Sequence, residues 1–289
     1  MLPLNKYLSL ITEKTQCSLK SIEAVLKLSE EGNTIPFIAR YRKEATGNID
    51  EVAIQSILEN SLYFVELEDR KNTILKAIES QDKLTDVLVK KITSCDNKSS
   101  LEDLYLPYKK RRKTRADIAK EKGLEPLADL LADPNNTKTP EVLAKDFVNE
   151  AKEVADTLEA LKGARDVWAQ RISDSSEIRQ YLREEMQTQG VIVSTVKKDW
   201  REKSSKYEQY YTYSQKASII TSHAFLAIQR GSKEGVLTYS IEIDSDLLKP
   251  VIFKKTFSTP ADSCRAELQK SIEDSLKRLL LPSIETQVA

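Results

Sequence analysis

The chain has 289 residues, 40% of them hydrophobic and 31% charged, and its 45 basic residues balance 45 acidic ones. This balance excludes a global electrostatic attraction to nucleic acid, so any such binding requires positive charge gathered locally. Glycine is scarce, at 7 residues, which argues against a strand-rich fold with many tight turns and favours helices joined by short connections.

The sequence carries no signal for a membrane or for a metal. Apolar runs are far too short to span a bilayer, and residues 1–9 lack the pattern of a signal peptide. Cys17, Cys95 and Cys264 are far apart, and His223 is the single histidine. Because a structural zinc site needs four closely placed ligands, we expect no metal and no other cofactor. Unpaired thiols are typical of a reducing cytoplasm, where we place the protein.

The first hundred residues predict successive amphipathic helices. Apolar side chains recur every three or four positions at Ile54, Leu58, Leu62 and Val65. A second apolar set at 84–92 predicts another helix. Ser100 begins a capping-box pattern, which predicts a short helix that starts there and stops at Pro107.

Helices continue through the middle of the chain. One is predicted from Arg115 to Gly123, because glycine favours the left-handed conformation that ends helices. Pro126 fits the first residue of the next helix. The polar stretch 133–140 contains two prolines and is the clearest predicted break, after which helices resume and run to about Gly190.

The pattern changes after residue 200. Residues 237–243 alternate between apolar and polar side chains and predict a half-buried strand, with 191–196 and 251–253 as candidate partner strands. A closing helix is predicted from Thr259 to Pro282. We therefore expect a mainly α fold, an elongated multi-helix array with a small β-hairpin or sheet near 191–254. The expected domains are an N-terminal helical domain at 1–133, a helical connector at 134–200 and a small α+β segment at 201–289.

The first candidate binding segment gathers three cations around a tyrosine: Arg40, Tyr41, Arg42 and Lys43. Cations beside an aromatic ring suit a surface that contacts phosphates and bases. A structural alternative exists, in which Phe37, Ile38 and Tyr41 belong to the core. The arginines would then pair with Glu44 or Asp50.

The second candidate is the segment 105–115, in which a basic run begins that has eight Lys or Arg residues against two acids over 109–122. Its binding residues would be Tyr108, Lys109, Lys110, Arg111, Arg112, Lys113 and Arg115. Each phosphate that such a segment neutralises steepens the salt dependence of binding by about 0.9 log units per decade of salt on duplex DNA. The alternative is a merely solvated loop, and nothing in the run is suited to reading base sequence.

The remaining patterns favour structure over chemistry. Four tyrosines within 207–213 could stack on bases, but a core-facing strand or irregular segment is the favoured interpretation. His223 follows a serine, yet no nucleophile elbow surrounds a serine here. Phosphate-binding, dinucleotide-binding, zinc-protease and calcium-loop motifs are also missing from the sequence. We therefore expect a protein that is not an enzyme and has no catalytic residues.

Two long strings resemble hallmark stretches of the Tex family, TIPFIARYRKEATGNIDE at 34–51 and LEDLYLPYKKRRKTRADIAKEKGLEPLA at 101–128. Weaker similarities follow in order at 163–173, 222–237 and 277–285. The resemblance therefore covers most of the chain. It identifies the chain as similar to bacterial cytoplasmic proteins that assist transcription.

The resemblance implies a longer parent protein. In Tex proteins a helical N-terminal region with a helix-turn-helix-like portion precedes a nuclease-like fold, helix-hairpin-helix elements and an S1-type domain. The family is tied to transcription and to binding RNA or single-stranded DNA. We therefore expect an N-terminal fragment without those later domains, acting as a nucleic-acid-binding scaffold. The alternative is a protein-interaction scaffold that docks RNA polymerase or another part of the transcription machinery.

Overall fold

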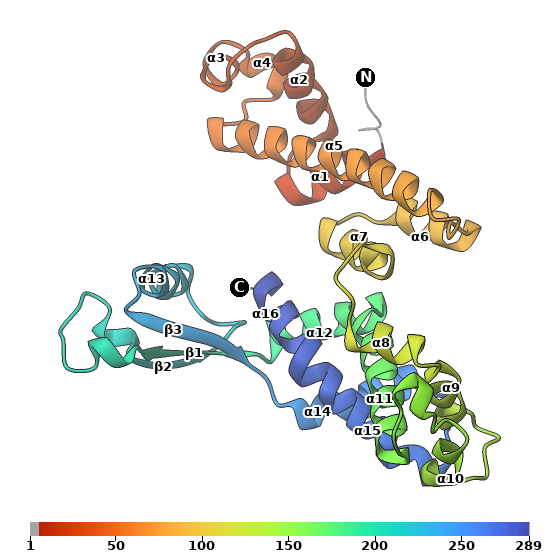
Figure 1. The fold of residues 1–289 in the computed structure, drawn as a ribbon. Coiled ribbons are helices and arrows are strands. Elements are labelled where there is room, and N and C mark those ends of the chain that lie inside the picture. The colour runs from red at the N-terminus through yellow and green to blue at the C-terminus, as the bar shows by residue number, and fades with distance from the viewer. Residues whose placement is uncertain (1–5, 289) are drawn as a thin grey trace. The chain divides into compact units, whose positions relative to one another are not determined.

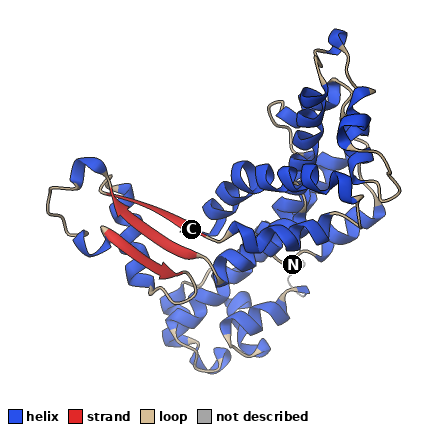
Figure 2. Ribbon diagram, turned by 90° about the horizontal axis from the view of Figure 1, so that it is seen from below, coloured by secondary structure: helices blue, strands red, loops and turns tan. Residues whose placement is uncertain are grey.

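The computed structural model describes residues 6–288, in which helices predominate, as Figures 1 and 2 show. The mainly α fold with a small sheet is therefore confirmed. Contacts between residues divide the chain into two compact units, Met1–Tyr108 and Lys109–Ala289.

The first unit contains helices and their connections, and no strand occurs in its described residues. Its helices are α1 (Leu8–Thr15), α2 (Leu19–Glu30), α3 (Ile35–Tyr41), α4 (Lys43–Thr46), α5 (Glu51–Glu79), α6 (Asp86–Ser94) and α7 (Lys98–Tyr105), followed by a 3₁₀ turn at Leu106–Tyr108. Helix α5 begins where Asp50 accepts a hydrogen bond of 2.7 Å from the Ala53 amide. Its buried stripe, including Ile54, Phe64 and Ile74, forms the centre of the first core. The helices predicted around 54–65 and 84–92 are thus confirmed.

The predicted start of the next helix was wrong. Helix α7 begins at Lys98, two residues before the expected cap, because the side chain of Asn97 accepts a hydrogen bond of 2.8 Å from the Ser100 amide. Ser100 therefore lies inside the helix and does not cap it.

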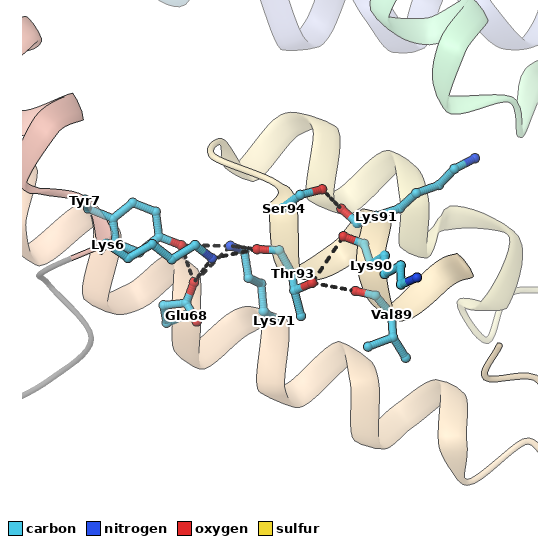
Figure 3. A network of polar contacts seen from close by, with 9 residues as sticks. All are labelled: Lys6, Tyr7, Glu68, Lys71, Val89, Lys90, Lys91, Thr93 and Ser94. Atoms are coloured by element: carbon cyan, nitrogen blue, oxygen red, sulfur yellow. Dashed lines mark hydrogen bonds and ion pairs between the residues drawn. The ribbon is translucent and has the colours of Figure 1, made fainter. Parts of the chain in front are cut away.

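A buried lysine ties the N-terminal segment to helices α5 and α6 (Figure 3). Lys71 is 1% exposed, and its ammonium donates to the Tyr7 hydroxyl at 2.7 Å, the Glu68 carboxylate at 2.9 Å and the Thr93 carbonyl at 3.1 Å. Tyr7 in turn donates to Glu68, and Lys6 donates to Thr93. Burial lowers the pKa of Lys71 more than the Glu68 carboxylate raises it. Hydrogen bonds stabilise the Lys71–Glu68 ion pair, since all three protons of the Lys71 ammonium have acceptors.

The second unit is built around one long helix. Helices α8 (Arg115–Glu121), α9 (Glu125–Ala132), α10 (Pro140–Lys145) and α12 (Ser176–Thr188) surround or adjoin α11 (Thr157–Ser173). Gly163 allows α11 to approach the connection between α8 and α9 closely, because a Cβ there would lie 2.2 Å from Cδ1 of Leu124. Gly123 has a φ of +82° just after α8, and Pro126 lies in the first turn of α9, both as predicted.

The two compact units have other bounds than the three domains expected from sequence, which stay a prediction. Helices α9 and α10 flank the polar stretch 133–140, yet both pack on α11 and belong to one core. The polar stretch therefore connects neighbours within one unit. The contact boundary lies instead at Tyr108, where one core ends and the basic run begins.

A three-stranded antiparallel sheet completes the second unit. Its strands are β1 (Val191–Val196), β2 (Thr212–Lys216) and β3 (Leu237–Glu242), in the order β2-β1-β3. Helix α13 (Ser222–Lys233) lies beside β3 and contacts it (Figure 1). Ala224 and Ile228 are among the buried residues of this helix. On the outer edge of β3, the Ile241 amide donates to the Glu285 carboxylate at 2.8 Å.

The expected third strand at 251–253 was wrong. These residues lie in α14 (Ser245–Thr256), which Asp244 caps by accepting from the Asp246 amide. Leu248 and Ile252, spaced four residues apart, are buried as a helical stripe. The apolar run resembled a strand because a short buried run has the same sequence pattern in either structure.

The expected end of the closing helix at Pro282 was also wrong. Helix α15 (Asp262–Asp274) passes into a π-helical turn at Ser275–Leu280, and α16 (Leu281–Val288) follows without a break. Pro282 lies in the first turn of α16, where a missing amide proton is tolerated. The wide π turn thus accommodates a proline that the sequence suggested as a stop.

Candidate nucleic-acid interfaces

A short segment of the first unit exposes cations beside aromatic rings. Phe37 and Tyr41 are 37% and 68% exposed, and their ring centroids are 5.2 Å apart. The Arg42 guanidinium lies 5.6 Å from the Phe37 ring centroid. A guanidinium and two rings thus adjoin on the surface. The 37–43 surface is defined by Phe37, Arg40, Tyr41, Arg42 and Lys43.

The backbone of this segment explains its exposure. Ile38 is fully buried in the first core and anchors α3, so the neighbouring side chains point outward. The helix is interrupted at Arg42, whose φ of −124° is outside the helical range, and α4 begins at the next residue. The break lies beside a shallow hollow of about 400 Å³ lined by residues 40–45.

The cations of the 37–43 surface are not neutralised. Over the described residues 6–288, no ion pair involves Arg40, Arg42 or Lys43. Asp50, an expected partner, caps α5 instead. The alternative that placed these side chains in the core is therefore correct for Ile38, which is buried, and wrong for Tyr41, which is exposed.

The basic run begins the second unit as an irregular segment. Residues 110–114 have no helix or strand, and Thr114 then starts α8 with a capping box shared with Asp117. The capping box fixes the point where the run ends, so the exposed basic side chains precede a well-anchored helix. The basic loop is defined by Lys109, Lys110, Arg111, Arg112, Lys113 and Arg115, all of them exposed.

Two members of the basic loop are paired with carboxylates. Arg111 makes a bidentate contact with Asp174 at 3.2 Å for each nitrogen, and Lys113 lies 2.8 Å from Glu121. For the other four members, the described part of the chain shows no ion pair. The loop therefore keeps a cationic surface, weaker than its sequence suggested.

Tyr108 differs from the rest of its segment. Its ring is half-buried against the core of the first unit, and its carbonyl accepts from the Gln81 amide at 3.1 Å. It therefore belongs to the first unit, whereas the basic loop belongs to the second. Arg40, Tyr41, Arg42 and Lys43 lie in the first unit as well, so the two sets of cations belong to different units.

Sequence reasoning missed Lys162, a further cation beside the basic run. Arg115 shares a hollow of about 320 Å³ with Lys122 and Lys162. Two carboxylates, Glu159 and Asp166, line the same hollow. Burial raises the pKa of Asp166 despite nearby arginines, which favours its neutral form. Lys162 is 47 positions beyond Arg115 in sequence, and only the packing of α8 on α11 brings them together.

The tyrosines of 207–213 are structural, as the favoured interpretation expected. Tyr207 and Tyr210 are 5% and 6% exposed and belong to the second core. Tyr213 meets Tyr210 edge-on at 5.4 Å. His223 is exposed at the start of α13, with Thr221 as its side-chain partner at 3.2 Å.

The described residues 6–288 contain no cluster of three or more metal-ligating side chains. All three cysteines are free thiols. No helix in this range is long and apolar enough to span a bilayer.

Comparison with known proteins assigns these elements to a family. A model of the Tex central region matches residues 135–280, which run from the polar stretch into the π turn. A model of the Tex-like protein N-terminal domain matches residues 5–79, which include the 37–43 surface. The chain belongs to the Tex family.

Individual relatives agree with this family. The chain is 42% identical over 280 residues to the uncharacterized protein YdcI of Bacillus subtilis, a match that covers 96% of this chain and 39% of the relative. It is 37% identical over 237 residues to the transcriptional accessory protein Tex of Neisseria gonorrhoeae, covering 82% and 31%. Identity is 26% over 287 residues to the human S1 RNA-binding domain-containing protein 1, covering 94% and 28%. The Tex-family chain thus spans well under half the length of each of these relatives.

Proposed function

We propose that this Tex-family chain is a nucleic-acid-binding scaffold, for RNA or single-stranded DNA, within a longer cytoplasmic transcription accessory protein. The observation that carries the proposal is the 37–43 surface, where exposed rings adjoin cations that have no carboxylate partner. Two relatives, a transcriptional accessory protein and an S1 RNA-binding domain-containing protein, support it by their names. The helix-turn-helix-like portion implied by the resemblance stays a prediction.

A single strand suits this surface better than a duplex. Stacking on an aromatic ring contributes about 1–3 kcal/mol per base, and only an unpaired, unstacked base offers its face. Tyr41 is the most exposed ring of the pair, so it is the expected stacking partner. Arg40 and Lys43 beside it would neutralise phosphates of the same strand.

The basic loop has a different expected role. Lys109, Lys110 and Arg112 are exposed and form no ion pair with a carboxylate within the described chain. They would contact phosphates without reading sequence, each contributing about 0.7 log units to the salt slope on a single strand.

Fluorescence anisotropy with labelled oligouridine and oligothymidine over a salt series tests the proposal. Tyr41→Ala should weaken binding by about 5- to 150-fold, the loss of one stacked base. Replacing Lys109, Lys110 and Arg112 with alanine should lower the salt slope by about two. Matched controls are Tyr105→Ala, a half-buried tyrosine of the same unit, and the triple alanine variant of the exposed Lys198, Lys233 and Lys277. Equal behaviour of site and control variants overturns the proposal.

We also propose that the chain binds without catalysing a reaction. Labelled RNA and DNA should stay intact when they are incubated with the chain and with Mg²⁺, Mn²⁺ or Zn²⁺ in turn. A cleaved product that disappears when the chain is omitted would contradict this part of the proposal.

A further inference from the structure

A groove in the second unit runs between helix α13 and the 3₁₀ turn Glu208–Tyr210. Its volume is about 420 Å³, within the range of about 300–1,000 Å³ that is usual for ligand pockets. It lies outside both cationic surfaces described above, since no residue of the 37–43 surface or of the basic loop lines it.

Helix α13 has two faces, and one of them forms a wall of this groove. Ala224, Ile228 and Gly231 are buried toward the sheet. A second stripe at spacings of three and four residues, His223, Leu226, Ala227 and Arg230, lines the groove. Leu226 is 50% exposed, so this stripe presents an apolar side chain to solvent between two basic ones.

Gly231 holds the opposite wall close to the helix. A Cβ on Gly231 would lie 3.1 Å from Cγ of Tyr207 and 2.6 Å from Cδ1 of Leu237. Only glycine therefore lets α13 approach both the strand and the tyrosine without displacing a side chain. The groove is thus a consequence of close packing and has a defined shape.

The rim of the groove is basic. Lys206, His223 and Arg230 line it together with Gln209, and none of its described lining residues is acidic. Glu234 lies 2.9 Å from Lys206 and also accepts from the Tyr207 hydroxyl, so it neutralises Lys206. Arg230 has no ion pair within residues 6–288, although Glu234 is close enough to interact with its charge, so it is the rim cation with the most charge left for a ligand.

The aromatic floor is unsuited to stacking on a base. Tyr207 and Tyr210 are nearly buried, the Lys206 ammonium lies 5.0 Å from the Tyr207 ring centroid, and Tyr210 meets another ring edge-on. The ring faces are covered by neighbouring groups, and the hollow is apolar with cations at its rim. Such a hollow fits an aliphatic or aromatic side chain flanked by carboxylates.

We propose that this groove docks a short acidic peptide segment of a partner protein, with one apolar side chain of the peptide against Leu226 and its carboxylates beside Arg230. This site goes beyond nucleic-acid binding and is independent of it. The peptide carboxylates would lie where the rim charge is unpaired, which favours acidic over basic partners. The buried apolar contact would supply most of the affinity.

The test selects peptides displayed on phage against the complete 289-residue chain. One library has apolar central positions between Asp and Glu flanks, a second has the same centre between Lys and Arg flanks, and a third has serine at the centre between acidic flanks. The first library alone should be enriched. The selected peptides are then synthesised with a fluorescent label and titrated by anisotropy.

Leu226→Glu and Arg230→Glu should each weaken binding of the selected peptides by about tenfold or more. Matched controls are Leu247→Glu on α14, a leucine that is 71% exposed, and Lys233→Glu on α13, which lies outside the groove. Both should bind the peptides like the unaltered chain, and far-ultraviolet circular dichroism checks that all variants fold.

Several results would overturn the proposal. These are no enrichment in the first library, equal enrichment in all three libraries, or equal binding by groove and control variants. Displacement of the peptides by oligouridine, with loss of oligouridine binding in Leu226→Glu, would assign the groove to nucleic acid and also reject the proposal.

Discussion

Replacing the buried Lys71 with methionine should destabilise the first unit by about 2–3 kcal/mol. Removing one partner of a buried ion pair typically costs about 3–5 kcal/mol. The lower value is expected here because the Glu68 side chain is 20% exposed and keeps Lys6 at 3.6 Å. Methionine retains the aliphatic volume of lysine, so the loss reports the polar contacts and not a cavity.

Hydrogen exchange of the α5 amides is the suitable assay. Both tryptophans of the chain, Trp168 and Trp200, lie in the second unit, so their fluorescence does not report the first. Since 1.4 kcal/mol corresponds to about tenfold, exchange through opening of the unit should accelerate by about 30- to 150-fold.

Lys98→Met is the matched control for this substitution. Lys98 pairs with Glu66 at 2.5 Å, but the two side chains are 42% and 53% exposed. An exposed pair contributes about 0–1 kcal/mol, so the exchange of α5 should change little. The reasoning is refuted if the Lys71 and Lys98 variants accelerate exchange equally.

Two further predictions concern the second unit, and tryptophan fluorescence during urea unfolding measures both. Gly163→Ala should cost about 1–3 kcal/mol through overpacking against Leu124, and an unchanged midpoint would show that the helices separate freely. Hydrogen bonds from Lys120 and Arg171 lower the pKa of Glu125. The contribution of Glu125 to the free energy of unfolding is therefore complete above the ordinary carboxyl pKa, and it is lost as the pH falls through the lowered pKa. Glu125→Gln should therefore lower the midpoint at neutral pH and converge with the unaltered chain in acid, whereas parallel curves at all pH values would contradict the assignment.

Local patterns in the sequence predicted the fold where one residue determines the backbone. Gly123 and Pro126 marked a helix end and a helix start correctly, because each has a conformational preference that neighbours rarely override. The alternation at 237–243 likewise predicted β3. Pro282 misled because its preference depends on whether it falls in the interior or in the first turn of a helix.

Contacts between distant segments could not be predicted in this way. Lys71 lies on a periodic helix and reads as solvent-facing, but Tyr7 and Thr93, which accept its protons, are 64 and 22 positions away. The same limit hid Lys162 beside Arg115. For the candidate surfaces, the sequence identified the cations. Only the structure showed that the side chain of Tyr41 is exposed to solvent and that of Tyr108 is half-buried.

The carboxylate of Glu285 on β3 has a consequence for association between copies of the chain. An outer strand offers free amides to which another extended chain can add, a common route to aggregation. Glu285 occupies the Ile241 amide, and the five-residue strand β2 at the other edge ends in Lys216. The addition of a strand from another chain is therefore opposed at both edges. The small sheet can keep two edge strands without promoting aggregation in a crowded solution.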